Sequence, residues 1–234
     1  GGGTSDFSLV RIGPRQRLRT DRREDILANH GVHVAGTDFD RRIELASILP
    51  CCGYRGAGPT GREVPSKVYF DLATWHLINT VYAPARVAEL NGMRSFYADA
   101  RQHARLMAVV QQRLGHALIA RAEAAKIALA EGGVGDIDLE LLEAGLRVPF
   151  DQSAASAAID ADMERIADAA AQTLSQAGLA PGRVDALYFT GGSTGLAPLT
   201  NRIAARFSGA RIVRGNRFAS VAQGLGLHAQ RLFG

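Results

Sequence analysis

The amino-acid sequence predicts an α/β fold with an inserted α-rich subdomain. Short apolar runs typical of strands alternate with helical stretches near both ends of the chain, whereas its middle has an almost continuous helical pattern. A strand, a glycine-rich turn and a helix also follow one another in the last quarter of the chain, which is the order expected in an α/β layer.

The composition excludes several classes of protein. Of the 234 residues, 47% are hydrophobic and 21% charged, and the mean hydropathy is −0.02, which is typical of a globular protein rather than a disordered or collagen-like chain. Because no run of about 18 apolar residues is present, we expect no membrane partner. A net charge of +4 is too small to require a nucleic-acid partner, and we expect none.

The cysteine and histidine pattern predicts neither a disulfide nor a metal site. Cys51 and Cys52 are neighbours, which rarely pair without backbone strain, and two cysteines cannot complete a four-ligand zinc site. The six histidines lack the spacing of zinc ligands. A reducing compartment is the simplest interpretation, so we expect the protein in the cytoplasm.

The first forty residues are predicted to form a β-meander. Residues 7–12 form an apolar run, and a Gly-Pro turn follows at 13–14. The arginines that alternate through residues 15–19 predict a returning strand, because alternate side chains share one face. Residues 26–33 predict a third strand that breaks at Gly31.

The middle of the chain is predicted to be helical. A helix starts at Thr37 or Asp38 and runs through residue 49, and a Gly/Pro-rich loop covers residues 52–65. Further helices follow, with Tyr69 and Trp75 as core residues of the first. Their predicted ranges are 69–81, 87–90 and 96–130.

The last hundred residues predict a hairpin and then alternating helices and strands. The hairpin covers residues 137–150, and Asp151 or Ser153 starts the helix that follows. The predicted order is a helix to residue 176, a strand at 186–189, a turn at 190–195, a helix to 207, a strand at 211–213 and a helix at 219–232.

Two glycine-rich turns are candidates for phosphate binding. They are residues 1–4 and residues 191–195, the latter between a strand and a helix. Glycine lets main-chain N–H groups approach a phosphate closely, but no Lys-Ser/Thr follows either turn, so neither is a P-loop. Taken alone, each turn fits a tight connection better than a phosphate cradle.

Several charged residues have two interpretations. Asp6, Asp38 and Asp40 could face a cation, although the last two also suit the start of a helix. Glu123 and Lys126 share a helix face and could form a solvated ion pair. The arginines of residues 11–23 form a basic cluster on a solvated hairpin, and the lack of interleaved aromatic residues disfavours nucleic-acid binding.

Five segments in order resemble motifs of the DnaK-type seventy-kilodalton heat-shock chaperones, which belong to the actin-like ATPase superfamily. Residues 1–9 (GGGTSDFSL) resemble the second phosphate-binding hairpin, and residues 33–42 (HVAGTDFDRR) resemble the segment that follows it. Residues 122–129 resemble the adenosine-contacting helix, residues 188–194 the adenosine motif and residues 220–225 the closing helix. Residues 67–76 (KVYFDLATWH) resemble a segment of the short YegD-type proteins of this family, which lack the peptide-binding domain.

The resemblance implies the second lobe of the actin-like, ribonuclease H-like fold, with the first lobe absent from this chain. Residues 1–33 and 151–234 would be the α/β core of that lobe, and residues 34–150 would be its α-rich peripheral subdomain with a hairpin. The implied cofactor is ATP or ADP with Mg. The implied function is that of a chaperone ATPase, with unfolded client proteins or co-chaperones as partners and with hydrolysis only in the intact two-lobed protein.

The resemblance also assigns roles to individual residues. Thr4 and Asp6 would place the cation or the attacking water, in the manner of phosphoryl-transfer sites. The remaining residues would bind the nucleotide, the first four at its phosphates and the others around its adenosine: Gly1, Gly2, Gly3, Thr4, Gly36, Glu123, Lys126, Gly191, Gly192, Ser193 and Leu196.

Three residues depart from the family pattern. Ala130 replaces a hydroxyl that faces the adenine, Gly195 replaces an arginine that packs on the base, and Phe218 replaces an acidic residue. These departures keep an alternative open, in which a degenerate actin-like fold acts as a protein-interaction scaffold without nucleotide turnover.

Overall fold

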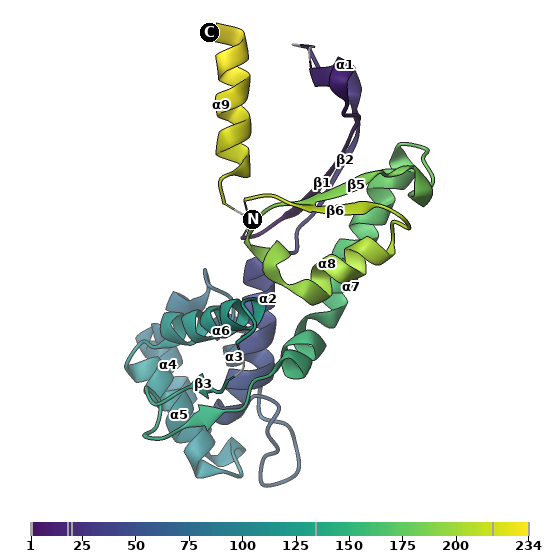
Figure 1. Ribbon diagram of the computed structural model, residues 1–234. Helices are drawn as coiled ribbons and strands as arrows, with labels where there is room; N and C mark the ends of the chain where they lie inside the picture. The colour runs from purple at the N-terminus through teal and green to yellow at the C-terminus, as the bar shows by residue number, and fades with distance from the viewer. Residues whose placement is uncertain (1, 18, 20, 134, 217, 234) are drawn as a thin grey trace. The chain divides into compact units, whose positions relative to one another are not determined.

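The computed structural model describes residues 2–233 except 18, 20, 134 and 217, and it shows a mixed α/β protein (Figure 1). Helices contain 57% of the residues, and the sheets are small. The chain divides into two compact units, of which unit 1 is Gly1–Gly36 with Asp160–Gly234 and unit 2 is Thr37–Ile159. Within the described residues, no helix is long and apolar enough to cross a membrane.

Unit 1 begins with an antiparallel pair, β1 (Ser5–Val10) and β2 (Ile26–Val32), in which Asp6 pairs with Gly31. The predicted returning strand is wrong, because residues 14–17 form a helical turn, α1 (Pro14–Arg17). Proline fixes φ near the helical value and suits the first helical position, which explains the turn. The predicted break at Gly31 is also wrong, since β2 runs through it.

The second half of unit 1 is a β–α–β unit beside a long helix. Helix α7 (Gln152–Gln176) leads to β5 (Ala186–Phe189), α8 (Ala197–Ala205) and β6 (Arg211–Arg214), and β5 and β6 pair in parallel. The apolar stripe of α7 is buried at i, i+3 and i+4 spacing, as expected for a core-facing helix. Its fully buried members include Met163, Ile166, Ala167 and Ala170.

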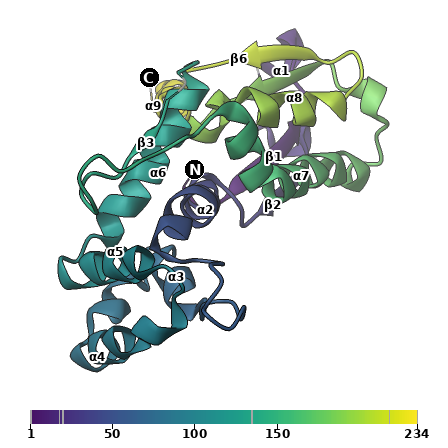
Figure 2. The same cartoon turned by 90° about the horizontal axis from the view of Figure 1, so that it is seen from below.

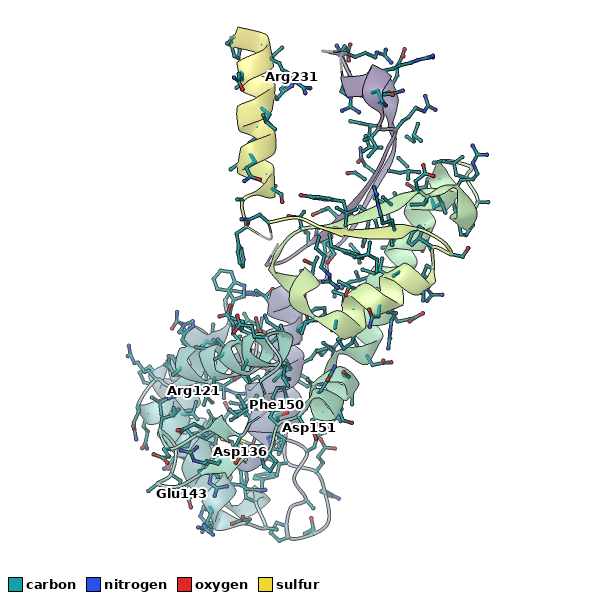
Figure 3. All side chains as sticks on the ribbon, viewed as in Figure 1. Arg121, Asp136, Glu143, Phe150, Asp151 and Arg231 are labelled. Carbon is teal, nitrogen blue, oxygen red and sulfur yellow. The ribbon has the colours of Figure 1, made fainter. Side chains whose placement is uncertain are left out.

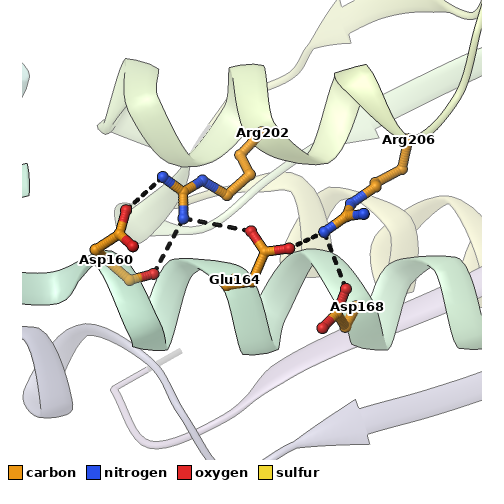
Figure 4. Close-up of polar contacts among 5 residues, drawn as sticks. All are labelled: Asp160, Glu164, Asp168, Arg202 and Arg206. Atoms are coloured by element: carbon orange, nitrogen blue, oxygen red, sulfur yellow. Dashed lines mark hydrogen bonds and ion pairs between the residues drawn. The ribbon is translucent and has the colours of Figure 1, made fainter.

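An ion-pair network joins α7 to α8, and Figure 2 shows the two helices side by side. Arg202 lies 2.6 Å from Asp160, and Arg206 lies 3.0 Å from Asp168 (Figure 4). Glu164 stands between them and contacts both arginines. These side chains are partly exposed, so each pair is worth about 0.2–1 kcal/mol, and their shared function is to fix the register of α8 on α7.

The described residues of unit 2 are mainly helical, with one hairpin of two-residue strands and an isolated bridge between Ala57 and Glu63. Its first helix, α2 (Gly36–Ile43), continues as a π-helical turn (Glu44–Ile48) and a 3-10 turn (Leu49–Cys52). The next helices are α3 (Lys67–Leu72), the 3-10 segment Ile78–Tyr82 and α4 (Pro84–Gly92). The short strands β3 (Ile137–Asp138) and β4 (Arg147–Val148) pair where the hairpin is predicted.

The single long helix predicted over residues 96–130 is two helices, α5 (Ala100–Gln111) and α6 (Gly115–Ala130). Arg113 adopts a left-handed conformation with φ of 56° between them. Large apolar side chains from α2, α3, α5 and α6 form the core of unit 2. Its fully buried residues include Phe39, Ile43, Tyr69, Leu72, Leu106 and Leu118.

Candidate functional site

The first group of predicted site residues lies at the start of β1 in unit 1. The Thr4 hydroxyl donates a hydrogen bond to Asp6 Oδ2 over 2.9 Å, so the two predicted catalytic side chains contact each other. Asp6 is exposed, and the exposed Gly2 and Gly3 precede the strand. Gly1 lies outside the described residues.

Gly31 is a residue of this group that sequence reasoning missed. It pairs with Asp6 across the sheet, and a Cβ at position 31 would lie 2.6 Å from Asp6 Oδ1. Glycine is therefore required for the Asp6 side chain to keep its position. A glycine inside a strand pattern is a known sign of such close approach. The sequence pattern at Gly31 instead predicts a break in the strand.

The second group lies in the turn between β5 and α8, also in unit 1. Gly191 has φ of 94°, which L-residues rarely adopt, and it precedes a 3-10 turn, Gly192–Gly195. The Thr194 hydroxyl donates to the Gly191 carbonyl over 2.7 Å. Ser193 is partly exposed, whereas Leu196 is buried and anchors the turn to the core of the unit.

The third group lies in unit 2, where α6 packs against the π-helical turn that follows α2 (Figure 1). Lys126 Nζ lies 2.6 Å from Asp40 Oδ1, and both side chains are nearly buried. Asp40 thus pairs with α6 instead of capping α2, which already begins at the buried Gly36. Glu123, one turn before Lys126, is exposed.

The surroundings of Asp40 shift the pKa of its carboxyl in opposite directions. Burial raises the pKa of the Asp40 carboxyl, the Lys126 ammonium lowers it, and the carboxylates of Glu123 and Asp38 raise it further. The net effect is a pKa above its ordinary value. A second acid, Glu44, is fully buried one helical turn beyond, and neither of its carboxyl oxygens has a hydrogen-bond partner among the residues that the structure describes.

Asp38, Asp40 and Glu123 line a pocket of about 270 Å³ within unit 2. Three segments far apart in the sequence line it: the start of α2, the turn that follows α3, and the middle of α6. The lining residues are Thr37, Asp38, Asp40, Arg41, Ala73, Thr74, Trp75, His76, Ile119 and Glu123. The volume is near the lower end of the range for small-molecule sites, which suits one ring system with a small substituent.

Trp75 is the residue of this pocket that sequence reasoning placed wrongly. The sequence predicts a core position on a helix, but Trp75 lies in the turn after α3 and is 64% exposed. Tyr69, predicted in the same way, is fully buried. Helix α3 ends at Leu72, so the periodicity that buries Tyr69 does not extend to Trp75.

The predicted site residues are therefore in two groups within unit 1 and one within unit 2. Glu123 lines the pocket, Lys126 is paired with a lining residue, and Gly36 begins the helix that contributes four lining residues. No three histidine, cysteine, aspartate or glutamate side chains come together as metal ligands among the described residues. The chain matches no model of a known protein family.

Proposed function

We propose that this chain is the nucleotide-binding second lobe of a DnaK-like ATPase of the YegD type, with the actin-like fold. In the intact protein it would couple the binding of ATP or ADP with Mg to lobe closure and would act as a molecular chaperone. Five ordered sequence segments support the family, and the mixed α/β architecture is compatible with it.

One observation carries the nucleotide-binding part of the proposal. The pocket of unit 2 collects residues from three segments that resemble family motifs separately: Asp38 and Asp40, Trp75 and His76, and Glu123. Convergence of distant segments on one concave, mainly apolar site with a few polar groups is the usual mark of a ligand site.

The charges of the pocket favour the nucleoside end of a nucleotide. Three carboxylates (Asp38, Asp40 and Glu123) and one cation (Arg41) line the pocket, and Lys126 pairs with Asp40, so the lining is slightly acidic. Such a lining repels phosphates and accepts hydrogen bonds from ribose hydroxyls and amino groups. The family resemblance assigns residues 1–4 to the phosphates, where Mg would be bound together with them, and Gly191, Gly192 and Ser193 to the adenosine.

The test is a calorimetric titration of Mg-ADP into the intact protein, which is this chain with the first lobe that the proposal requires. Loss of a hydrogen bond to a charged group costs about 1.5–3 kcal/mol, so Glu123→Ala should weaken binding at least tenfold. Gly192→Trp should abolish Mg-ADP binding, because the large side chain would block the exposed turn between β5 and α8. Glu63→Ala, an exposed glutamate away from the pocket, is the matched control. An intact parent protein that fails to bind Mg-ADP contradicts the proposal.

One observation favours the alternative, a scaffold without nucleotide turnover. Every side chain of α9 (Ser220–Phe233) from Val221 onward is exposed, and Figure 3 shows Arg231 on this helix. Three of its exposed apolar residues, Val221, Leu225 and Leu232, form a stripe at helical spacing, which is a form of partner-binding surface, whereas Leu227 and Phe233 lie off this stripe. A null titration with the intact protein would move the search to protein partners of this stripe.

A further inference from the structure

We infer that Trp75 is the base-stacking residue of the pocket in unit 2 and determines its preference for a purine. The inference rests on the proposed nucleotide-binding function and names a residue that the family resemblance does not assign. It starts from three properties of Trp75: its position in the pocket lining, its exposure and the firm anchoring of its backbone.

Trp75 keeps a ring face that its aromatic neighbour, His76, does not cover. Its ring and that of His76 are nearly perpendicular, at 83°, with centroids 5.7 Å apart. Whichever ring presents its edge, this T-shaped contact leaves at least one face of the indole uncovered by His76. The side chain is 64% exposed, although a tryptophan gains much by burial. A flat ligand that stacks on this face would complete the burial.

The backbone that carries Trp75 is fixed on both sides. Before it, the Thr74 hydroxyl donates to the Phe70 carbonyl over 2.8 Å, and Ala73 N–H donates to the Tyr69 carbonyl over 2.9 Å. After it, Leu77 N–H donates to the Thr74 carbonyl over 2.7 Å. A ring on an anchored turn binds with a small loss of conformational entropy, as a preorganised site requires.

The rest of the lining selects among flat ligands. The carboxylates Asp38 and Glu123 offset the cation Arg41, so a neutral ring with hydrogen-bond donors suits the pocket better than an anion. A nucleobase with its ribose has this chemistry and a suitable size for about 270 Å³. Since stacking grows with ring area, an indole wall favours purines over pyrimidines.

The test compares Mg-ADP with Mg-UDP by calorimetry on the intact protein, using Trp75→Ala and Trp75→Phe. Loss of one stacked base contact corresponds to about a tenfold change in affinity. We expect Trp75→Ala to weaken ADP binding about tenfold and UDP binding about twofold, so that the purine preference falls about fivefold. Trp75→Phe, which keeps an aromatic face, should stay within about threefold. Phe96→Ala, an exposed aromatic residue outside the pocket lining, is the control.

Fluorescence supplies a second readout that does not depend on the stability of Trp75→Ala. Trp75 is the single tryptophan of the 234 residues. Subtracting the fluorescence of the Trp75→Phe protein from that of the parent protein therefore isolates the emission of Trp75. ADP should quench this signal and protect it from acrylamide. Tight ADP binding with unchanged Trp75 fluorescence and an unchanged purine preference would overturn this inference and leave the proposed function standing. Absence of ADP binding to the parent would overturn both.

Discussion

At the scale of single residues, the buried carboxyl of Glu44 links folding to pH. Burial raises its pKa well above the ordinary value, and the nearby Asp40 carboxylate raises it further. The folded chain therefore keeps the Glu44 proton at pH values where the unfolded chain has lost it. Stability is then full below the ordinary glutamate pKa and falls as pH rises toward the raised value, by at most about 1.4 kcal/mol per pH unit.

Glu44→Gln should remove this slope, because the amide stays neutral in both states. Urea unfolding at pH 5 and pH 8 checks the prediction: the parent should lose more stability between the two than the variant. Glu63→Gln, at an exposed glutamate, should follow the parent. Equal slopes for the parent and Glu44→Gln would show that the folded chain ionises Glu44 without cost.

At the scale of elements, the junction between α5 and α6 depends on one strained residue. Leu114 N–H donates to the Val109 carbonyl over 2.8 Å, which is the bond that ends a helix in a Schellman motif. This motif needs a left-handed residue, normally glycine, and here that residue is Arg113, with φ of 56°. A side chain with a Cβ costs about 1 kcal/mol in this conformation.

The comparison of Arg113→Gly with Arg113→Ala isolates this backbone cost, because both variants lose the arginine contact with the Tyr82 ring. We expect the glycine variant to be about 1 kcal/mol more stable, measured by urea unfolding. At the exposed Ala104 inside α5 the order should reverse, with Ala104→Gly about 1 kcal/mol less stable than the parent. If alanine and glycine are equivalent at position 113, the left-handed residue stores no strain.

The same junction shows where sequence reasoning succeeds and fails for elements. The strand at Ala186–Phe189 is confirmed at its predicted bounds, because an apolar run followed by glycines is a strong local signal. The long helix over 96–130 is wrong: the apolar periodicity continues through residues 112–114, and the local sign of a break is the glycine that follows them, Gly115, at which α6 begins. The break is set by packing: the Gly115 N–H donates to the Tyr82 hydroxyl, and a Cβ there would lie 2.6 Å from Ile78.

The candidate site was predictable only in pieces. Asp40, Glu123 and Lys126 are recognisable in the sequence as residues suited to binding. The pocket that Asp40 and Glu123 line, and the pairing of Lys126 with Asp40, depend on how α2 packs near α6. Trp75 was unpredictable because a tryptophan near a helix is usually core, and only the end of α3 at Leu72 exposes it. The roles of Thr4, Asp6 and the glycine turns remain predictions.

At the scale of the whole molecule, the division into units predicts that residues 37–159 fold on their own. The segment is continuous, it falls within the usual domain size, and it contains its own core of fully buried side chains from four helices. The segment also contains Trp75, the single tryptophan, so tryptophan fluorescence and circular dichroism both report on the unfolding of residues 37–159. We expect the two signals to give one coincident urea transition, as two-state unfolding requires.

A core substitution gives this prediction its control. Leu118 is fully buried in α6, and its truncation to alanine should cost the isolated segment about 2–5 kcal/mol, as it does in well-packed cores. The same substitution in the 234-residue chain should shift only the transition that Trp75 reports, because its lost contacts belong to unit 2. A gradual, non-cooperative loss of signal from residues 37–159 would mean that the core of unit 2 needs unit 1 to form. The pocket would then depend on both units, and nucleotide binding to it could be measured only in a chain that contains both.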